Sequence, residues 1–236
     1  MRSAVSCVVS KRSAPLAFLS TAYQEVRYEW YMVDHIPQPP VSEPRGPLHA
    51  AAFRPSKLAH VVLRTARFRE TRRWYLTVLD AAVAFENQDV AFLRYDDEHH
   101  RIGIINAPDA SPLDGGSAGV EHVSFTFDKL EELLATYLRL KQQGIVPYWP
   151  IIHGPTVSLY YRDPNGVKVE LQYDVLRTRE EVDAFFAAGN YLENFMGVIF
   201  DPDEMIRRFE SGEPLESLTK RPPLPPGLGP WDMHRP

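Results

Sequence analysis

Two histidines and one glutamate have the residue types and spacing of a metal site. His60 and His122 lie 62 positions apart in segments of similar sequence, and Glu170 lies near the end of the second of two related units. Two imidazoles and one carboxylate can hold Fe(II) on one face and leave its other coordination positions open. The sequence therefore predicts an iron site that needs no thiolate ligand.

Each of these residues also has a plainer interpretation. A single histidine is more often a core or surface residue than a ligand, and a single glutamate on a sheet is usually solvated. The metal interpretation is favoured because the two histidines occupy the same position in a repeat, with Glu170 on the strand that closes it.

Glu170 belongs to residues 153–174, whose pattern predicts two strands joined by a tight turn. The segment Asp163–Gly166, with sequence Asp-Pro-Asn-Gly, is typical of a turn because Pro fixes φ and Asn and Gly accept positive φ. Side chains alternate across a strand, so Glu170 shares a polar face with Lys168 and Gln172, opposite the valines. A carboxylate on a covered sheet face needs a partner such as a cation or a metal.

The repeat predicts the elements that position these residues. Both halves predict one strand, one helix and three strands, and a shift of 62 positions places Tyr75 on Tyr137. The expected elements of the first half are a strand over 56–63, a helix over 67–79, and strands over 83–85, 90–95 and 100–105. Those of the second half are a strand over 120–127, a helix ending at Gln143 with Asp128 as N-cap, and strands over 146–151, 156–162 and 167–173.

One such unit cannot close its own core, but two side by side form a cup lined by both inner faces. The expected fold class is therefore α+β, with paired βαβββ modules forming a curved mixed sheet cup. Pseudo-twofold packing would bring His60 and His122, expected in mid-strand, to the centre of this cup.

The chain divides into three predicted regions. These are an N-terminal extension (1–55), a two-module domain (56–175, with modules 56–108 and 117–175), and a helical C-terminal extension with a proline-rich tail (176–236). The first 24 residues carry basic side chains and no acid, which fits a targeting segment, a disordered arm or a start codon assigned too early. Helices are expected over 179–188 and 202–211.

Composition narrows the classes of partner. The net charge is −5 without long runs of one sign, which argues against nucleic acid or an anionic membrane as the main partner. Cys7 is the single cysteine, so no intrachain disulfide or thiolate cluster can form, and no apolar run approaches the roughly 20 residues that span a bilayer. We expect a cytoplasmic protein.

From about Lys57 to Asp174, half of the chain, the sequence resembles the vicinal oxygen chelate superfamily. Within it, the sequence resembles the type I extradiol dioxygenases, which cleave catechols. The similar segments are LAHVVL, FLRYDDEHHRIGI, VEHVSFTF and HGPTVSLYYRDPNGVKVELQYD. The resemblance implies a glyoxalase/bleomycin resistance/extradiol dioxygenase-like fold. It also implies that His60, His122 and Glu170 bind Fe(II), or Mn(II), which accepts the same ligands.

The resemblance implies three further roles. His100 would lie near O2, His153 would be an acid–base residue, and the Tyr160 hydroxyl would bond a substrate oxygen. Alternation along a strand would put His99 and His100 on opposite faces, so that only His100 faces the cup. An alternative for His153 is an ordinary loop residue before a Gly-Pro turn.

The predicted function is extradiol cleavage of a catechol-type aromatic diol with O2, by a homo-oligomer, a dimer or larger, as expected by analogy. The alternatives are a metal-dependent lyase or isomerase that does not use O2, and a metal-free protein that binds a planar drug. An isomerase of this fold uses four protein ligands, and residues 101–107 contain no acid to supply the fourth. Tyr148, Trp149 and Phe195 are expected as pocket walls.

Overall fold

A computed structural model describes residues 54–111 and 118–236 of the chain. Most of the predicted N-terminal extension, including the basic first 24 residues, lies outside the described residues. Residues 55–236 belong to one unit of the fold, and they contain both predicted modules and the C-terminal extension.

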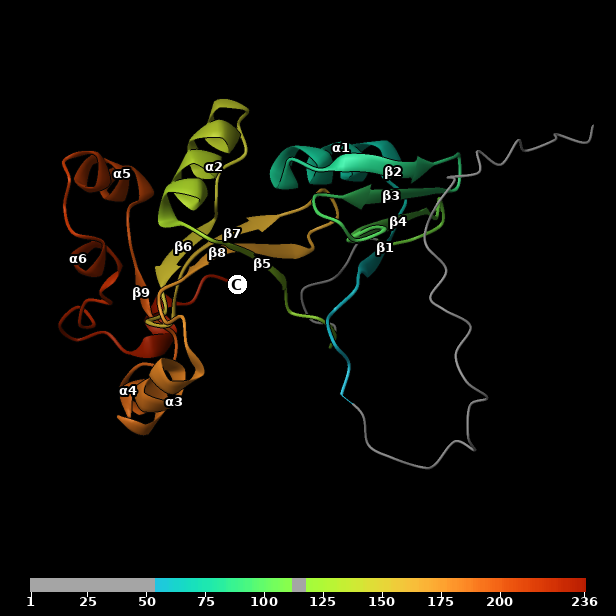
Figure 1. Cartoon of the computed structure of the whole chain (residues 1–236). Helices are drawn as coiled ribbons and strands as arrows, with labels where there is room; N and C mark the ends of the chain where they lie inside the picture. The colour runs from blue at the N-terminus through green and yellow to red at the C-terminus, as the bar shows by residue number, and fades with distance from the viewer. Residues whose placement is uncertain (1–53, 112–117) are drawn as a thin grey trace, which may run out of the picture. The chain divides into compact units, whose positions relative to one another are not determined.

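The first module has the predicted order of one strand, one helix and three strands. Its elements are β1 (Val61–Thr65), α1 (Phe68–Leu79), β2 (Ala82–Glu86), β3 (Val90–Arg94) and β4 (Ile102–Asn106). They form a mixed sheet of order β1-β4-β3-β2, in which β1 pairs parallel with β4. Helix α1 lies on one face of this sheet (Figure 1) and buries Tyr75 and Val78 there.

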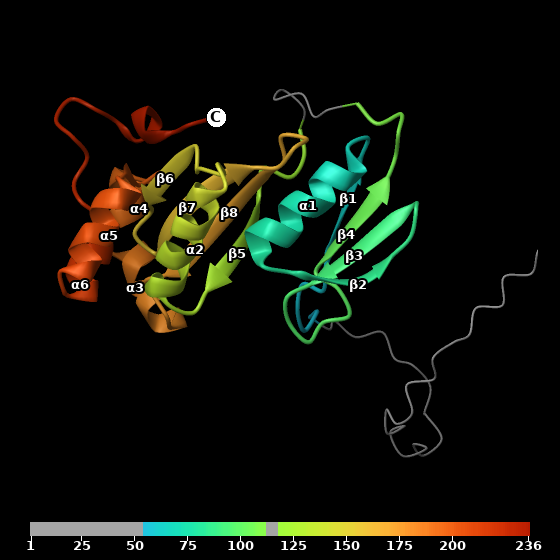
Figure 2. The same ribbon diagram turned by 90° about the horizontal axis from the view of Figure 1, so that it is seen from above.

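The second module repeats this topology. Its elements are β5 (Val123–Phe127), α2 (Leu130–Gln142), β6 (Trp149–Ile152), β7 (Thr156–Arg162) and β8 (Lys168–Asp174). The sheet order is β5-β8-β7-β6, again with a parallel pair between the first and last strands, and Figure 2 shows α2 over one face. The predicted α+β fold of paired βαβββ modules is therefore confirmed.

The start of α2 corrects one prediction. The N-cap is Lys129 and not Asp128, and the backbone N–H of Lys129 donates to the Glu132 carboxylate at 3.2 Å. The Asp128 carbonyl instead accepts a hydrogen bond from the Arg177 side chain. The helix begins one residue later than expected because a carboxylate of its first turn satisfies the free backbone donor.

The predicted hairpin is present, and its turn is held by its own aspartate. Asp163 Oδ1 accepts from the backbone N–H groups of Asn165 and Val167, at 2.7 and 2.9 Å. Asn165 also reaches the first module, where its Oδ1 accepts from Thr65 Oγ1 at 2.6 Å. The turn between β7 and β8 therefore links the two modules.

The C-terminal extension adds short helices and one strand. Its elements are α3 (Arg179–Ala187), α4 (Asn190–Glu193), β9 (Val198–Ile199), α5 (Pro202–Glu210), α6 (Leu215–Thr219) and the 3-10 helix η1 (Pro230–Met233). Strand β9 pairs antiparallel with β6 and becomes the fifth strand of the second sheet, which the sequence pattern did not predict. Among the described residues, no helix combines the length and apolar character needed to cross a bilayer.

Candidate functional site

His60 and His122 occupy equivalent positions at the entrance to the first strand of each module. Each is the residue directly before its strand, β1 or β5, so the expected mid-strand position is wrong. In the first module, the Arg101 guanidinium bonds the carbonyls of Leu58 and Ala59, at 2.7 and 3.0 Å. Because a side chain takes these carbonyls, strand pairing begins only at Val61.

The second module holds a buried pair of one carboxylate and one imidazole. Glu170 Oε2 lies 3.1 Å from His122 Nε2, and only 4% of Glu170 is exposed. The alternative of a solvated glutamate on an open sheet face is therefore wrong. Register explains the meeting, because Glu170 on β8 pairs with Ser124 on β5, two residues after His122.

The carboxylate of this pair is ionised at neutral pH. Burial alone would raise the pKa of the Glu170 carboxyl, but hydrogen bonds from His122 and neighbouring hydroxyl groups lower that pKa to about 2. The bond to Glu170 in turn raises the pKa of His122. A buried carboxylate that remains ionised beside an imidazole nitrogen has the donor chemistry of a divalent metal site.

Tyr160 and His153 extend this cluster. Tyr160 faces Glu170 across the β7–β8 ladder, and its ring meets that of His122 edge-on, with centroids 5.2 Å apart. The Tyr160 hydroxyl lies 3.1 Å from His153 Nε2. Burial, and then the charge of Glu170, raise the pKa of Tyr160, while burial lowers the pKa of His153. The structure thus brings together four of the six predicted residues.

The other two predicted residues form a second cluster in the first module. The His60 and His100 rings stack with centroids 4.3 Å apart, and His100 also stacks on Phe92 at 4.4 Å. His99 joins them, since its Nδ1 lies 2.6 Å from Nδ1 of His100. Burial, followed by the neighbouring His60, lowers the pKa of His100, which favours a neutral ring that can bind a metal.

The position of His99 corrects the expectation that His99 and His100 point to opposite faces. Alternation applies to an extended strand, but both residues lie before β4, where the chain is bent and follows no strand register. Sequence reasoning therefore also placed His99 wrongly. Its adjacency to His100 was the signal that could have indicated a cluster.

Within the described residues, one group of three side chains has ligand atoms within 4.8 Å of one another, and it consists of His60, His99 and His100. His60 is thus not grouped with His122 and Glu170, and their convergence on one ion stays a prediction. Both clusters offer imidazole nitrogen, and the cluster in the second module also offers the buried carboxylate of Glu170. These donors suit Fe(II) or Mn(II).

Two of the predicted pocket walls lie beside Tyr160. The Trp149 ring lies 4.6 Å from that of Tyr160, and its indole N–H donates to the Met233 carbonyl at 2.8 Å. The Tyr148 hydroxyl is buried without a hydrogen-bond partner among the described residues, and the Arg162 guanidinium lies over the Tyr148 ring. Phe195 packs instead against Trp231 and is 39% exposed, so it does not share their surroundings.

Comparisons with known proteins show the family of this chain. Residues 57–171 match the family described as Glyoxalase/Bleomycin resistance protein/Dioxygenase superfamily. Biphenyl-2,3-diol 1,2-dioxygenase 2 of Rhodococcus globerulus is 46% identical over 164 residues, which cover 69% of this chain and 86% of that protein. Biphenyl-2,3-diol 1,2-dioxygenase 3 of the same organism is 39% identical over 167 residues, covering 70% and 88%.

Among solved structures, a glyoxylase/bleomycin resistance protein/dioxygenase domain from Frankia sp. EAN1pec has a TM-score of 0.43 at 18% identity, covering 51% of this chain and 93% of that one. The two Rhodococcus relatives carry the assignment, because their identity is high and extends over most of their length. The chain belongs to the extradiol ring-cleaving dioxygenases of the Glyoxalase/Bleomycin resistance protein/Dioxygenase superfamily.

Proposed function

We propose that the chain cleaves the ring of an aromatic vicinal diol with O2 at an Fe(II) held by His60, His122 and Glu170. The observation that carries this proposal is the buried, ionised Glu170, which is bonded to His122 and flanked by Tyr160 and His153. A fixed carboxylate charge in this position attracts a metal cation, and the neighbouring hydroxyl and imidazole are suited to a substrate that loses a proton on binding.

When bound, the iron supplies a centre that lowers the pKa of the diol and lets electrons pass from the ring to O2. The protein's own residues do the remaining work. Neutral His153 can accept a diol proton at Nε2, and the Tyr160 hydroxyl orients the diol oxygen by a hydrogen bond. Tyr148 and Trp149 would bound the ring of the substrate.

His100 has a separate proposed role, near the oxygen. Its ring stacks on that of Phe92, with centroids 4.4 Å apart, which restricts the direction of its nitrogen atoms. An oriented N–H group can stabilise negative charge that develops on oxygen during the reaction. For this role, the His60 imidazole must exchange its contact with His99 and His100 for one with the metal.

The substrate class follows from the relatives, which are named for biphenyl-2,3-diol. We propose a catechol with an aromatic or other apolar substituent, because Tyr148 and Trp149 offer ring surfaces beside Tyr160. The decisive assay is oxygen uptake by the Fe(II)-loaded full chain with 2,3-dihydroxybiphenyl, catechol and a single-hydroxyl control. Uptake with diols only, matched by a yellow ring-opened product, supports the proposal, and diol binding without uptake contradicts it.

Reconstitution of the metal-free protein with each ion in turn distinguishes Fe(II) from Mn(II) as the active metal. We propose that Fe(II) restores turnover, and a chain that turns over with Mn(II) alone would reverse this choice. A cytoplasmic location and a homo-oligomer, with no role for nucleic acid or membrane, complete the proposal. Cell fractionation and light scattering of the purified chain test the location and the oligomeric state.

A further inference from the structure

His153 is held from both sides of its ring. Nε2 faces the Tyr160 hydroxyl at 3.1 Å, and Nδ1 contacts the backbone carbonyl of Met196 in the C-terminal extension. A carbonyl only accepts hydrogen bonds, so Nδ1 carries the proton and Nε2 of the neutral ring is free to accept one. We propose that the C-terminal extension fixes the tautomer of His153, with Arg221 as the positioning residue.

This inference rests on the proposed function only for the role of His153 as the proton acceptor. The contacts that determine the tautomer are independent of any metal or substrate. A ring with its proton on Nε2 would present a donor to Tyr160 and could not take a proton from the diol. Protein molecules in which His153 carries its proton on Nε2 would therefore be inactive.

The direction of the Met196 carbonyl is determined by the turn that contains it. Asn194 is buried, and its Oδ1 accepts from the backbone N–H groups of Met196 and Gly197, at 3.1 and 2.8 Å. Gly197 has φ +114°, and a Cβ there would lie 2.5 Å from the Ile152 carbonyl oxygen. Only glycine allows this turn to lie so close to the strand that precedes His153.

Arg221 ties this turn to the backbone of His153. Its Nη1 donates to the carbonyls of His153 and Asn194, at 2.9 and 2.7 Å, and its Nη2 donates to the carbonyl of Asn190 at 3.1 Å. The guanidinium also lies 5.5 Å from the centre of the Phe185 ring. The Arg221 guanidinium thus bonds both the backbone of His153 and the turn whose Met196 carbonyl accepts a hydrogen bond from the His153 ring.

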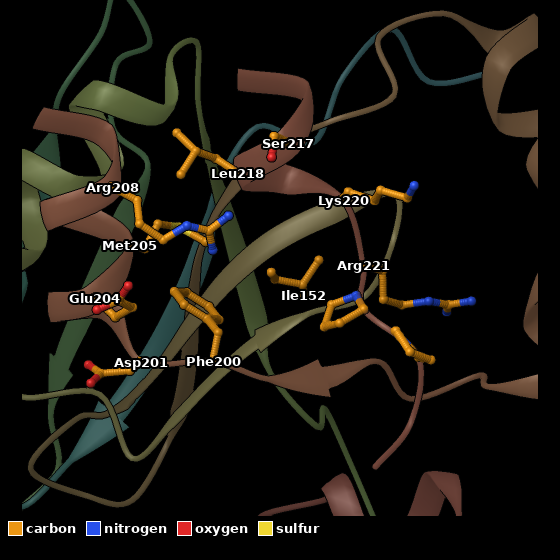
Figure 3. A pocket seen from close by; sticks show the side chains of 12 residues that line it. Ile152, Phe200, Asp201, Glu204, Met205, Arg208, Ser217, Leu218, Lys220 and Arg221 are labelled. Atoms are coloured by element: carbon orange, nitrogen blue, oxygen red, sulfur yellow. The ribbon is translucent and has the colours of Figure 1, made fainter. Parts of the chain in front are cut away.

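The rigid, planar guanidinium is suited to this arrangement. Its donors diverge in one plane and can reach three carbonyls at once, whereas a lysine ammonium is a single point on a flexible stem. Figure 3 shows Arg221 beside Ile152, at one side of a cavity of about 450 Å³. Arg208 lines the same cavity but bonds Glu213, through Nε at 2.7 Å, which makes it a matched control.

The variants are Arg221→Gln, Arg221→Lys and Asn194→Ala, with Arg208→Gln as control. Two measurements are made on each full-length chain. The first is ¹⁵N NMR of histidine-labelled, metal-free protein, in which the His153 signals are assigned by their loss in His153→Gln. The second is steady-state turnover of the Fe(II)-loaded protein, with bound iron and circular dichroism measured in parallel.

We expect wild-type His153 to show a protonated Nδ1 and an unprotonated Nε2. In Arg221→Gln the two tautomers should mix, and kcat should fall about 10- to 100-fold, with bound iron and KM within about twofold of wild type. Arg221→Lys should restore part of the wild-type tautomer population and part of kcat. Asn194→Ala tests the same contact by loosening the Met196 turn, and it replaces Arg221→Gln should that variant fail to fold.

Three results would overturn the inference. One is a wild-type tautomer in both Arg221→Gln and Asn194→Ala. Another is loss of bound iron in proportion to activity, which would indicate a general structural role. The third is an equal effect of Arg208→Gln. If the tautomer of His153 changes in the variants as expected but the wild-type protein cleaves no diol, the proposed function fails and the positioning by Arg221 stands.

Discussion

The two modules share one topology but differ in how their sheets are covered. All five residues of β2 in the first module are exposed, and the strands of that sheet have five residues each. In the second module, β7 and β8 have seven residues each, and β7 is buried on both faces from Val157 to Tyr161. The C-terminal extension causes part of this difference, because β9 pairs with β6 and Met233 accepts a bond from Trp149.

The modules also differ in the residue of the last strand that pairs with the first strand at the equivalent position. Ser124 pairs with Glu170, and the equivalent Val62 pairs with Gly103. The duplication therefore supplies two histidines but a single acid, and that acid lies in the better-covered sheet. The comparison teaches that the repeated architecture places a histidine at the equivalent position of each module, while burial in one copy determines where an ionised carboxylate is held.

The sharpest test of this asymmetry is Glu170→Gln, which keeps the size of the side chain and removes its charge. We expect bound iron and diol-dependent oxygen uptake to fall to background, because an amide is a poor ligand for Fe(II) and cannot balance its charge. Metal analysis and an oxygen electrode measure the result. Wild-type iron content in this variant would show that the first module's histidines hold the metal by themselves.

The next test concerns the histidines of the first module. His100→Gln should lower turnover by about 100- to 1000-fold while iron and diol remain bound, because one oriented donor to the developing charge is lost. His99→Gln should stay within about twofold of wild type, since its ring has no assigned role. Loss of iron in His99→Gln would favour the group of three histidines as the metal site.

The difference in burial predicts a difference in stability. Leu159→Ala in β7, at a fully buried position, should lower the free energy of unfolding by about 2–5 kcal/mol. Phe85→Ala in β2, where the side chain is 51% exposed, should cost less than about 1 kcal/mol. Urea unfolding followed by circular dichroism checks both values, and equal losses would contradict the comparison.

The smallest expected effect is the pH dependence of the His122–Glu170 pair in metal-free protein. The bond to Glu170 raises the pKa of His122, so its contribution is complete below the unfolded value of about 6.5 and is lost as the pH rises through the folded pKa. The pKa of Glu170 is lowered to about 2, so its contribution is present above the ordinary glutamate pKa of 4.5 and is lost as the pH falls toward 2.

The stability lost in His122→Gln should therefore be largest between these two limits, near about pH 5.5, and smaller near about pH 8.5. The difference should stay below about 1 kcal/mol, because the His122 side chain is 35% exposed and solvent screens the pair. Urea titrations of both proteins at the two pH values measure it. A loss that grows as the pH rises would contradict the assigned ion pair.

Much of the fold was predictable because the sequence carries the hydrophobic periodicity of its strands and helices. The alternation from Val157 to Tyr161, the Asp-Pro-Asn-Gly turn and the helical spacing of Leu130 and Leu133 depend on contacts within one element, and each element appeared where expected. The offset of 62 between His60 and His122 likewise predicted their equivalent positions. The ends of elements were less predictable, as Lys129 in place of Asp128 shows, because a cap depends on which side chain reaches the free backbone donor.

The sequence by itself determined the duplicated modules, the residue types of the site and the presence of one acid on the closing strand. Tertiary structure alone decided that Glu170 is buried and bonded to His122, that His99 joins His60 and His100, and that Met196 and Arg221 hold His153. The physical reason is the distance along the chain over which each interaction acts. Period and turn chemistry act between neighbours along the chain, whereas burial and hydrogen-bond partners come from segments tens of residues away, as with Arg221 and His153.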